Sequence, residues 1–240
     1  MSMAIVLSIL SFSSSLLSSS TFNPYNRTFA YAQENPLPND DNSNNKNNIS
    51  LSNLIKQGSP HLGNLSAPIT IVDFSDFQCH LCARYVKSTE PQINITYIQT
   101  GKVNLVFKHL PNRGIDSTAP SLAAQCTNDQ GKFWDFHKLL YGNQGPIDSG
   151  WASRDNLKKF ASKIPGLNMH QFNSCFENEK YKTFVAKDLA LAASFGFTDT
   201  PSFIIVNSDG SDPEILKGAQ PFPSFKALIE KKIEQGRHLQ

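Results

Sequence analysis

The chain has 240 residues, with 22 Lys and Arg against 20 Asp and Glu, so its formal net charge is only +2. This near-neutral balance excludes the clustered basic excess by which nucleic-acid-binding proteins hold phosphates, and we expect no nucleic-acid partner. Four cysteines are too few for a small scaffold held together by disulfides, so the fold must depend mainly on a hydrophobic core.

The N-terminal 32 residues have the features of a targeting segment. Residues 4–10 read AIVLSIL, a run too short for the roughly 20 apolar residues of a membrane-spanning helix but suited to the core of a secretory signal. Ala30, Tyr31 and Ala32 supply a cleavage pattern, although it lies far beyond the apolar run and no Lys or Arg precedes that run. Residues 1–32 are predicted to be a signal peptide or an N-terminal membrane anchor, with a disordered cytosolic extension as the alternative.

A polar segment separates this leader from the rest of the chain. Residues 33–60 are rich in Asn and cannot bury enough apolar surface to offset the entropy of ordering, so they are predicted to be a disordered linker. Residues 61–240 are expected to form a single domain. This organisation predicts a protein outside the cytoplasm, secreted or tethered to the outer face of the cell membrane, and we expect it to be a monomer.

The domain is expected to begin with a strand–helix–strand unit. Residues 69–74 (ITIVDF) form a short, β-branched apolar run and predict a buried strand. A helix follows from Cys79, with a kink expected at Pro91, and residues 103–107 alternate as the next strand. The usual handedness of such crossovers makes this a right-handed βαβ unit.

The rest of the domain divides into a helical block and a second group of strands. Residues from about 115 to 195 lack strand signals, whereas residues 202–206 (SFIIV) predict a strand and residues 214–216 its hairpin partner. Residues 222–233 have the apolar spacing of a helix. The order is typical of an α/β fold, βαβ followed by ββα, with an inserted helical subdomain. Within the block, helices are predicted over residues 121–128, 132–141, 154–164 and 177–195.

Two cysteines open the first helix in the pattern Cys79-x-x-Cys82. Free backbone N–H groups and the helix dipole stabilise an anion at a helix N-terminus, where cysteine pKa values fall to roughly 3.5–7.5 from about 8.5. Cys79 is therefore expected to be the exposed attacking sulfur and Cys82 the buried resolving thiol. A static disulfide or half of a zinc site would use the same spacing, but the preceding strand and following helix favour redox chemistry.

An acidic residue, Asp73, interrupts the first strand six positions before Cys79. A carboxylate on a buried strand is costly unless it has a task, and one below the two cysteines can take the proton of Cys82. The alternative is an acid at the strand end that simply reaches water. Ser75 and Asp76 are candidate N-caps for the helix.

Thr200-Pro201 precedes the strand at 202–206. A proline is ordinary at the first position of a strand. The alternative is a cis-proline loop packed against the two cysteines, with the backbone of Thr200 pairing with a substrate as an added strand.

Three stretches together resemble the DsbA-like thiol:disulfide oxidoreductases, which have a thioredoxin fold with a helical insertion. They are residues 71–82 (IVDFSDFQCHLC), the helix at 132–141 and residues 200–203 (TPSF). The resemblance extends from about Gly58 to the C-terminus.

The resemblance implies a role for each motif residue. Cys79 is then the nucleophile, Cys82 the resolving thiol, Asp73 the buried acid and Pro201 the cis-proline. It also implies an enzyme that oxidises cysteine-containing secreted proteins without a cofactor and passes the electrons to a membrane redox partner.

The dipeptide between the cysteines departs from the family pattern. It is often Pro-His or Pro-Phe in the family, and here it is His80-Leu81. A histidine cation next to Cys79 still favours the thiolate, so the change is expected to affect the redox potential and not the chemistry. Disulfide reduction or isomerisation by the same fold is therefore the alternative to oxidation.

The remaining cysteines, Cys126 and Cys175, both lie in the helical block. Buried free thiols are one possibility, because cysteine packs as a small hydrophobe. In an exported chain an even remainder of two favours a structural disulfide.

Two further hypotheses come from other classes of protein. The four cysteines could hold zinc in a binding module, although they lack the second close pair that zinc sites usually supply. A redox-inactive chaperone that holds unfolded chains would not need Cys79.

Overall fold

A computed structural model of the protein describes residues 58–238. The predicted signal peptide or anchor at 1–32 and nearly all of the predicted linker lie outside the described residues. No helix within the described part of the chain is long and apolar enough to cross a membrane.

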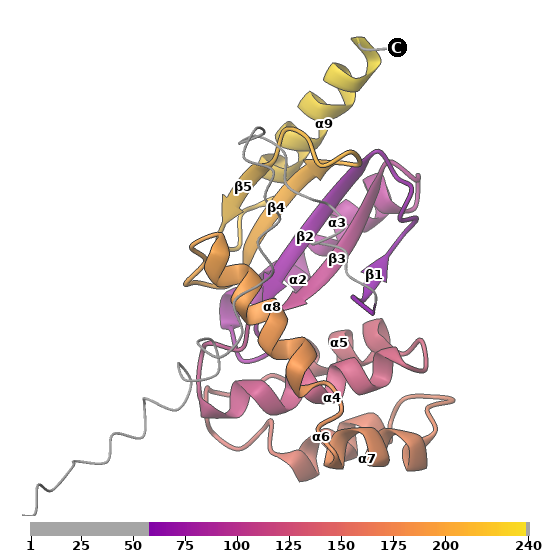
Figure 1. Ribbon diagram of the computed structural model, residues 1–240, viewed down its shortest axis with the longest axis vertical. Helices are drawn as coiled ribbons and strands as arrows, with labels where there is room; N and C mark the ends of the chain where they lie inside the picture. Colours follow the sequence, from indigo (N-terminus) through magenta and orange to yellow (C-terminus); the bar gives the residue numbers. More distant parts are fainter. Residues whose placement is uncertain (1–57, 239–240) are drawn as a thin grey trace, which may run out of the picture. The chain divides into compact units, whose positions relative to one another are not determined.

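The described residues contain a mixed five-stranded sheet with the order β1-β3-β2-β4-β5 (Figure 1). β2 is parallel to β3 and antiparallel to β4, and the hairpin partner β5 occupies one edge. This is the thioredoxin-like α/β arrangement that the sequence predicts. The strands are β1 (His61–Leu62), β2 (Ile69–Ser75), β3 (Val103–His109), β4 (Ser202–Asn207) and β5 (Glu214–Lys217).

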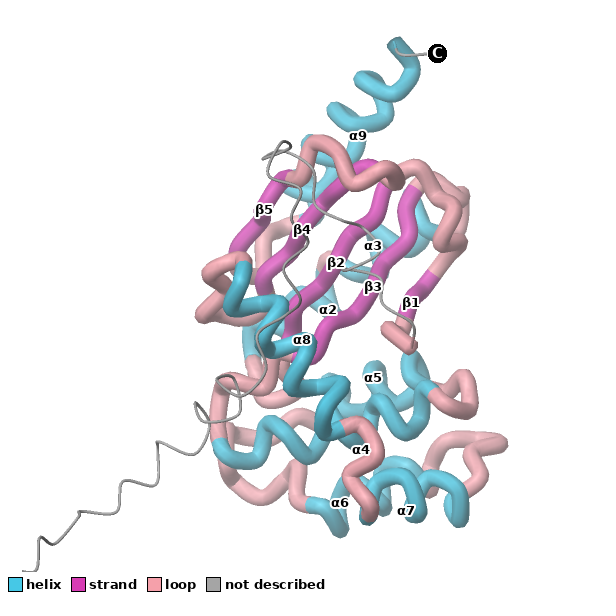
Figure 2. The backbone as a smooth tube through the Cα atoms, viewed as in Figure 1, coloured by secondary structure: helices cyan, strands magenta, loops and turns pink. Residues whose placement is uncertain are grey.

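The central strands β2 and β3 are buried at every position. Continuous apolar runs are typical of strands covered on both faces, and Figure 2 shows helices on both sides of the sheet. Side chains alternate between the faces. Val72 and Phe74 pack on the face covered by α8 (Lys182–Ser194), whereas Ile69 and Ile71 join the larger core.

The crossover between β2 and β3 consists of three helical pieces. α2 (His80–Ser88) ends before Thr89, α3 (Glu90–Ile93) begins with Pro91 in its first turn, and a π-helical turn covers Asn94–Ile98. Proline is tolerated there because the first N–H groups of a helix have no intrahelical partner. The predicted kink at Pro91 is therefore a break between two helices. The C-terminal helix is α9 (Phe222–His238), which buries Phe225 and Ile229 in the larger core.

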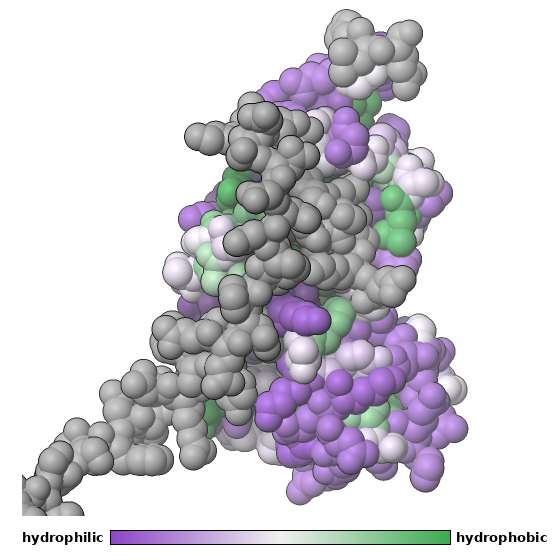
Figure 3. All heavy atoms as spheres, in the orientation of Figure 1, coloured by the Kyte–Doolittle hydropathy of each residue, from purple (hydrophilic) through white to green (hydrophobic). Residues whose placement is uncertain are grey.

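Helices occupy the chain between β3 and β4, and their outer surface over α6 and α7 is mostly hydrophilic in the view of Figure 3. Their buried side chains, including Leu122 and Phe136, are continuous with the core under β2 and β3. Besides α8, these helices are α4 (Thr118–Asn128), α5 (Phe133–Gly142), α6 (Arg154–Ala161) and α7 (Met169–Glu177).

The predicted helix over 177–195 is wrong at its start. α7 ends at Glu177, and α8 begins only at Lys182. Glu179 adopts the left-handed conformation (φ 47°), and the Lys180 N–H bonds to the Cys175 carbonyl, which closes α7 in a Schellman-type cap. Glycine usually marks that position, so a glutamate there gives no signal in the sequence.

Candidate active site

The two cysteines lie where the polypeptide leaves β2 and enters α2. Cys79 is the N-cap of α2, and its Sγ accepts a hydrogen bond from the Cys82 backbone N–H at 3.4 Å. His80 is the first helical residue and is exposed, whereas Leu81 is half-buried. Both thiols are free in the structure. Neither Ser75 nor Asp76 caps the helix, because the sulfur of Cys79 does so itself.

The protein environment shifts the pKa values of the two thiols in opposite directions. A hydrogen bond from the Cys82 side chain is the main cause that lowers the pKa of Cys79 to about 5, and burial opposes it. The Thr200 side chain and the charge of Arg113 lower that pKa further. Burial raises the pKa of Cys82 well above its ordinary value, and the charge of Cys79 adds to the rise. Near neutral pH Cys79 is therefore a thiolate, whereas Cys82 remains a protonated thiol.

The expectation that Cys79 is exposed is wrong, since only 1 % of the residue is accessible. Its Sγ lies 3.2 Å from the Thr200 carbonyl oxygen, to which the thiol form donates a hydrogen bond. The Gln144 side chain donates to the Cys79 carbonyl at 3.1 Å. Two segments distant in sequence thus contact Cys79, one at its sulfur and one at its carbonyl, which the local sequence around Cys79 does not reveal.

The loop before β4 faces these sulfurs. The Thr200–Pro201 peptide bond is cis, and Thr200 is buried. On the other side of the loop the Gly218 N–H donates to the Pro201 carbonyl at 2.8 Å. The structure therefore places Thr200, the residue before the cis-proline, against the Cys79 sulfur.

Arg113 is a site residue that the sequence analysis did not identify. Its Nε donates to the Thr200 hydroxyl at 3.0 Å, and its Nη2 lies 3.2 Å from the Thr200 carbonyl oxygen and 3.3 Å from Asp199 Oδ1. It follows the carboxyl end of β3, which lies beside β2 in a parallel pair, so the loops after both strands meet at one edge. This topology is the signal that could have identified Arg113.

Asp76 anchors the Arg113 loop to the active-site turn. One carboxylate oxygen accepts the Gln78 N–H, and the other accepts the N–H groups of Asn112 and Arg113, each at 2.8 Å. Asp76 thus positions the guanidinium that reaches Thr200.

Gln78, directly before Cys79, connects the turn to the helical insertion. Its amide exchanges two hydrogen bonds with Asp148, one in each direction and both at 2.9 Å. The Asp148 carboxylate also accepts the backbone N–H groups of Ile115 and Asp116. These contacts hold the start of the insertion and the loop between α5 and α6 beside the cysteines, and no motif in the sequence indicates them.

Asp73 lies on the β2 face that carries Ile69 and Ile71, the face toward α2, and is 1 % exposed. Burial raises its pKa to about 7. The Ser75 hydroxyl donates to Oδ1, whereas Oδ2 has no hydrogen-bond partner among the residues described. The charge of Asp73 contributes to the raised pKa of Cys82, so the two groups interact electrostatically.

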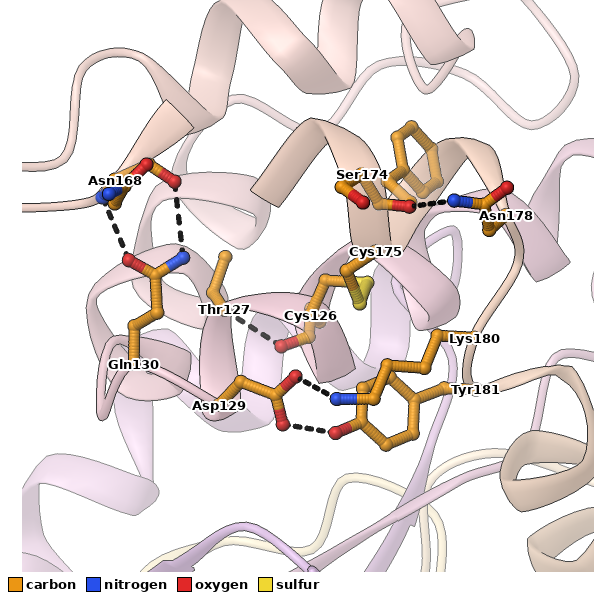
Figure 4. The surroundings of a disulfide bond; sticks show 12 residues. Cys126, Thr127, Asp129, Gln130, Asn168, Ser174, Cys175, Asn178, Lys180 and Tyr181 are labelled. Carbon is orange, nitrogen blue, oxygen red and sulfur yellow. Dashed lines mark hydrogen bonds and ion pairs between the residues drawn. A yellow bond between two sulfur atoms is a disulfide. The ribbon is translucent and has the colours of Figure 1, made fainter. Parts of the chain in front are cut away.

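Cys126 and Cys175 form a disulfide that joins α4 to α7, with an S–S distance of 2.03 Å (Figure 4). Beside it the Asp129 carboxylate bonds to Lys180 and Tyr181. The four cysteines thus form two separate pairs, which leaves no four-cysteine zinc site. No cluster of three or more metal-ligating side chains occurs within residues 58–238.

Comparison with known proteins agrees with this geometry. The thioredoxin family model matches residues 56–231. A probable disulfide bond formation protein D of Bacillus cereus is 30% identical over 177 residues, which cover 72% of this chain and 78% of that protein. Among solved structures, oxidised BdbD of Bacillus subtilis (TM-score 0.65, 26% identity) covers 74% of this chain and 94% of its own. Wolbachia pipientis alpha-DsbA1 (TM-score 0.68, 25% identity) covers 79% and 100%.

Proposed function

Because this chain belongs to the thioredoxin family and is a DsbA-like thiol:disulfide oxidoreductase, we propose that it acts as an oxidase that introduces disulfides into protein substrates. The observation that carries this proposal is the Cys79 sulfur, whose pKa is lowered to about 5 at the N-terminus of α2. A stable thiolate favours the reduced enzyme, so the oxidised enzyme gives up its disulfide readily.

The reaction uses the disulfide form of the Cys79–Cys82 pair. A substrate thiolate attacks Cys79, the bond between the cysteines breaks, and Cys82 leaves as a thiolate that takes up a proton. A second substrate thiolate then attacks the substrate sulfur of the mixed disulfide, and Cys79 leaves as a thiolate. The substrate loses two electrons to the cysteine pair, and no cofactor takes part.

Asp73 is the group that exchanges a proton with Cys82. Its pKa of about 7 allows it to give or take a proton near neutral pH, as a general acid or base should. In the oxidising direction it protonates the departing Cys82 sulfur, and during reoxidation it accepts the same proton. The electrostatic coupling between Asp73 and Cys82 supports this role.

The substrate chain binds at Thr200 and Pro201. A peptide laid beside the loop before β4 would extend the sheet by backbone hydrogen bonds and bring its cysteine to Cys79. The 3.2 Å distance between Cys79 Sγ and the Thr200 carbonyl supports this placement.

The protein works as a monomer outside the cytoplasm, secreted or tethered to the outer face of the membrane, and a membrane redox partner reoxidises it. The Cys126–Cys175 disulfide supports this location because structural disulfides are rare in the reducing cytosol. The apolar run at residues 4–10 supports export. N-terminal sequencing of the mature protein from membrane and secreted fractions distinguishes an anchor from a cleaved signal.

Equilibration with glutathione buffers tests the direction of the reaction. An oxidase should have a potential near that of the strong oxidant DsbA, about −120 mV, whereas a value at or below about −270 mV would instead identify a reductase. Cys79→Ser should abolish oxidation of a reduced substrate protein. Retention of full activity by that variant would instead favour a chaperone.

A further inference from the structure

A group of buried polar atoms lies between α2, α3 and α5, beyond Asp73. Within residues 58–238, buried side-chain atoms without a hydrogen-bond partner include Asp73 Oδ2, Tyr85 Oη, Glu90 Oε2 and His137 Nε2. Buried polar atoms are seldom left unpaired in proteins, and internal water commonly satisfies them. The four atoms are therefore of the kind that internal water bridges.

The members of this group are close enough to influence one another. Tyr85 lies one helical turn after Cys82 on the same face of α2, and both are fully buried. The Glu90 Oε2 and His137 Nε2 atoms are 3.9 Å apart, too far for a direct hydrogen bond. Burial, and after it the charge of Asp73, raises the pKa of both Tyr85 and Glu90.

Glu90 is also the member nearest to solvent. Its side chain is 13 % exposed, whereas that of His137 is 1 % exposed. Burial raises the pKa of Glu90 to about 8, close to the value of about 7 for Asp73. A proton can pass between groups of similar pKa without a large free-energy step.

We infer that Tyr85, Glu90 and His137, bridged by internal water, form a proton path between Asp73 and solvent at the N-terminus of α3. This inference rests on the proposed function of the Cys79–Cys82 pair. When Cys82 attacks a mixed disulfide at Cys79, its proton passes to Asp73 and then along this path to water. The three residues are positioning residues, because they act through Asp73 and touch neither sulfur.

Other charged groups around the path affect its pH dependence. Burial raises the pKa of Glu90, and the charge of Lys138 on α5 partly opposes that rise. Burial lowers the pKa of His137, and the charge of Lys138 adds to that fall. His109 on β3 contributes to the lowered pKa of His137, which is about 3, so the imidazole is neutral near pH 7. It can therefore accept or donate a hydrogen bond to water without carrying charge.

The test separates the two steps of oxidation by glutathione disulfide. Cys79 first attacks to form a mixed disulfide and releases one glutathione, and Cys82 then attacks Cys79 and releases the second. Rapid mixing of the reduced full-length protein measures both phases between pH 5 and 9, in H₂O and D₂O. The variants are Glu90→Gln and Tyr85→Phe, and the matched control is Glu234→Gln, on the exposed face of α9.

Both variants should slow the second phase about tenfold near pH 7, less than the roughly 10²–10⁴-fold effect of a direct general base. The first phase, the equilibrium potential and the Glu234→Gln control should not change, and Glu90→Gln should remove an inflection near pH 8. Second-phase rates and pH profiles equal to wild type in both variants would overturn the path. If Glu90→Gln fails to fold, Tyr85→Phe decides alone. Absence of both phases in the wild type would instead refute the proposed function.

Discussion

Each face of the sheet carries a buried carboxylate, and the two carboxylates differ in the partners that surround them. On the face toward α8, Asp188 pairs with the Lys108 ammonium at 3.0 Å and accepts the His109 N–H at 3.1 Å. On the face toward α2, Asp73 receives one hydroxyl donor and no cation from residues 58–238. The first arrangement compensates the charge and fixes a helix to the sheet. The second leaves the carboxyl able to titrate, and it is the one beside the cysteines.

The largest expected effect comes from breaking the compensated pair. Lys108→Met should destabilise the protein by about 3–5 kcal/mol, because it removes the buried ammonium that pairs with the Asp188 carboxylate at 3.0 Å. Lys108 is 1 % exposed, so solvent does not screen this loss. Urea unfolding measures the change.

The matched control is Lys231→Met, which removes an exposed ion pair with Glu214. It should change the unfolding midpoint little, because water replaces a surface partner. Equal destabilisation by both substitutions would show that burial of the pair does not matter.

Removal of the charge of Asp73 should have the opposite effect and stabilise the protein. The folded pKa of Asp73, about 7, lies above its ordinary 3.8, so its protonated form stabilises the fold at low pH and that stability is lost between about pH 4 and 7. Asp73→Asn should therefore stabilise the protein above pH 7, by up to about 4 kcal/mol from three pKa units.

Unfolding measurements at pH 4 and pH 8 show whether the stabilisation by Asp73→Asn depends on pH in the expected direction. The gain should be present at pH 8 and largely absent at pH 4, and the same variant should slow thiol–disulfide exchange. A gain that is equal at both pH values would show that Asp73 does not titrate between them.

The smallest expected effect comes from replacing Arg113, whose charge acts on the Cys79 thiol. Arg113 contributes its charge to Cys79 only after hydrogen bonds and burial, so Arg113→Gln should raise the pKa of the Cys79 thiol modestly. Thiolate absorbance against pH measures that pKa. Arg113→Lys keeps the charge but loses the guanidinium donors to Thr200, so it separates the effect of the charge from that of the hydrogen bonds. An unchanged pKa in both variants would remove Arg113 from the site.

The sequence predicted the features that are encoded locally. Strand β2, the Cys79–Cys82 turn and the loop at Pro201 each have a pattern within about ten residues, and the DsbA-like resemblance connects them. Arg113 and Asp148 have no such pattern, because their partners lie distant in the chain and meet them only after folding. The exposure of Cys79 was mispredicted for the same reason, since Thr200 and Gln144 cover it from remote loops.

The same limit explains the error in the helical insertion. The break between α7 and α8 depends on the backbone of Glu179, whose side chain is not selective for that conformation. Glu90 and His137 likewise carry no motif. Their importance follows from buried atoms that lack partners in the described part of the structure.

The disulfide between α4 and α7 also bears on how the enzyme matures. Closing a loop between residues 49 apart stabilises a fold by about 4 kcal/mol in the chain-entropy model. Each new copy must first lose two electrons from Cys126 and Cys175, which is the same transformation that the proposed oxidase would carry out on others. Under the proposed function the protein is therefore a product of its own class of reaction, and its supply in the cell is tied to the oxidising capacity that it would help to provide.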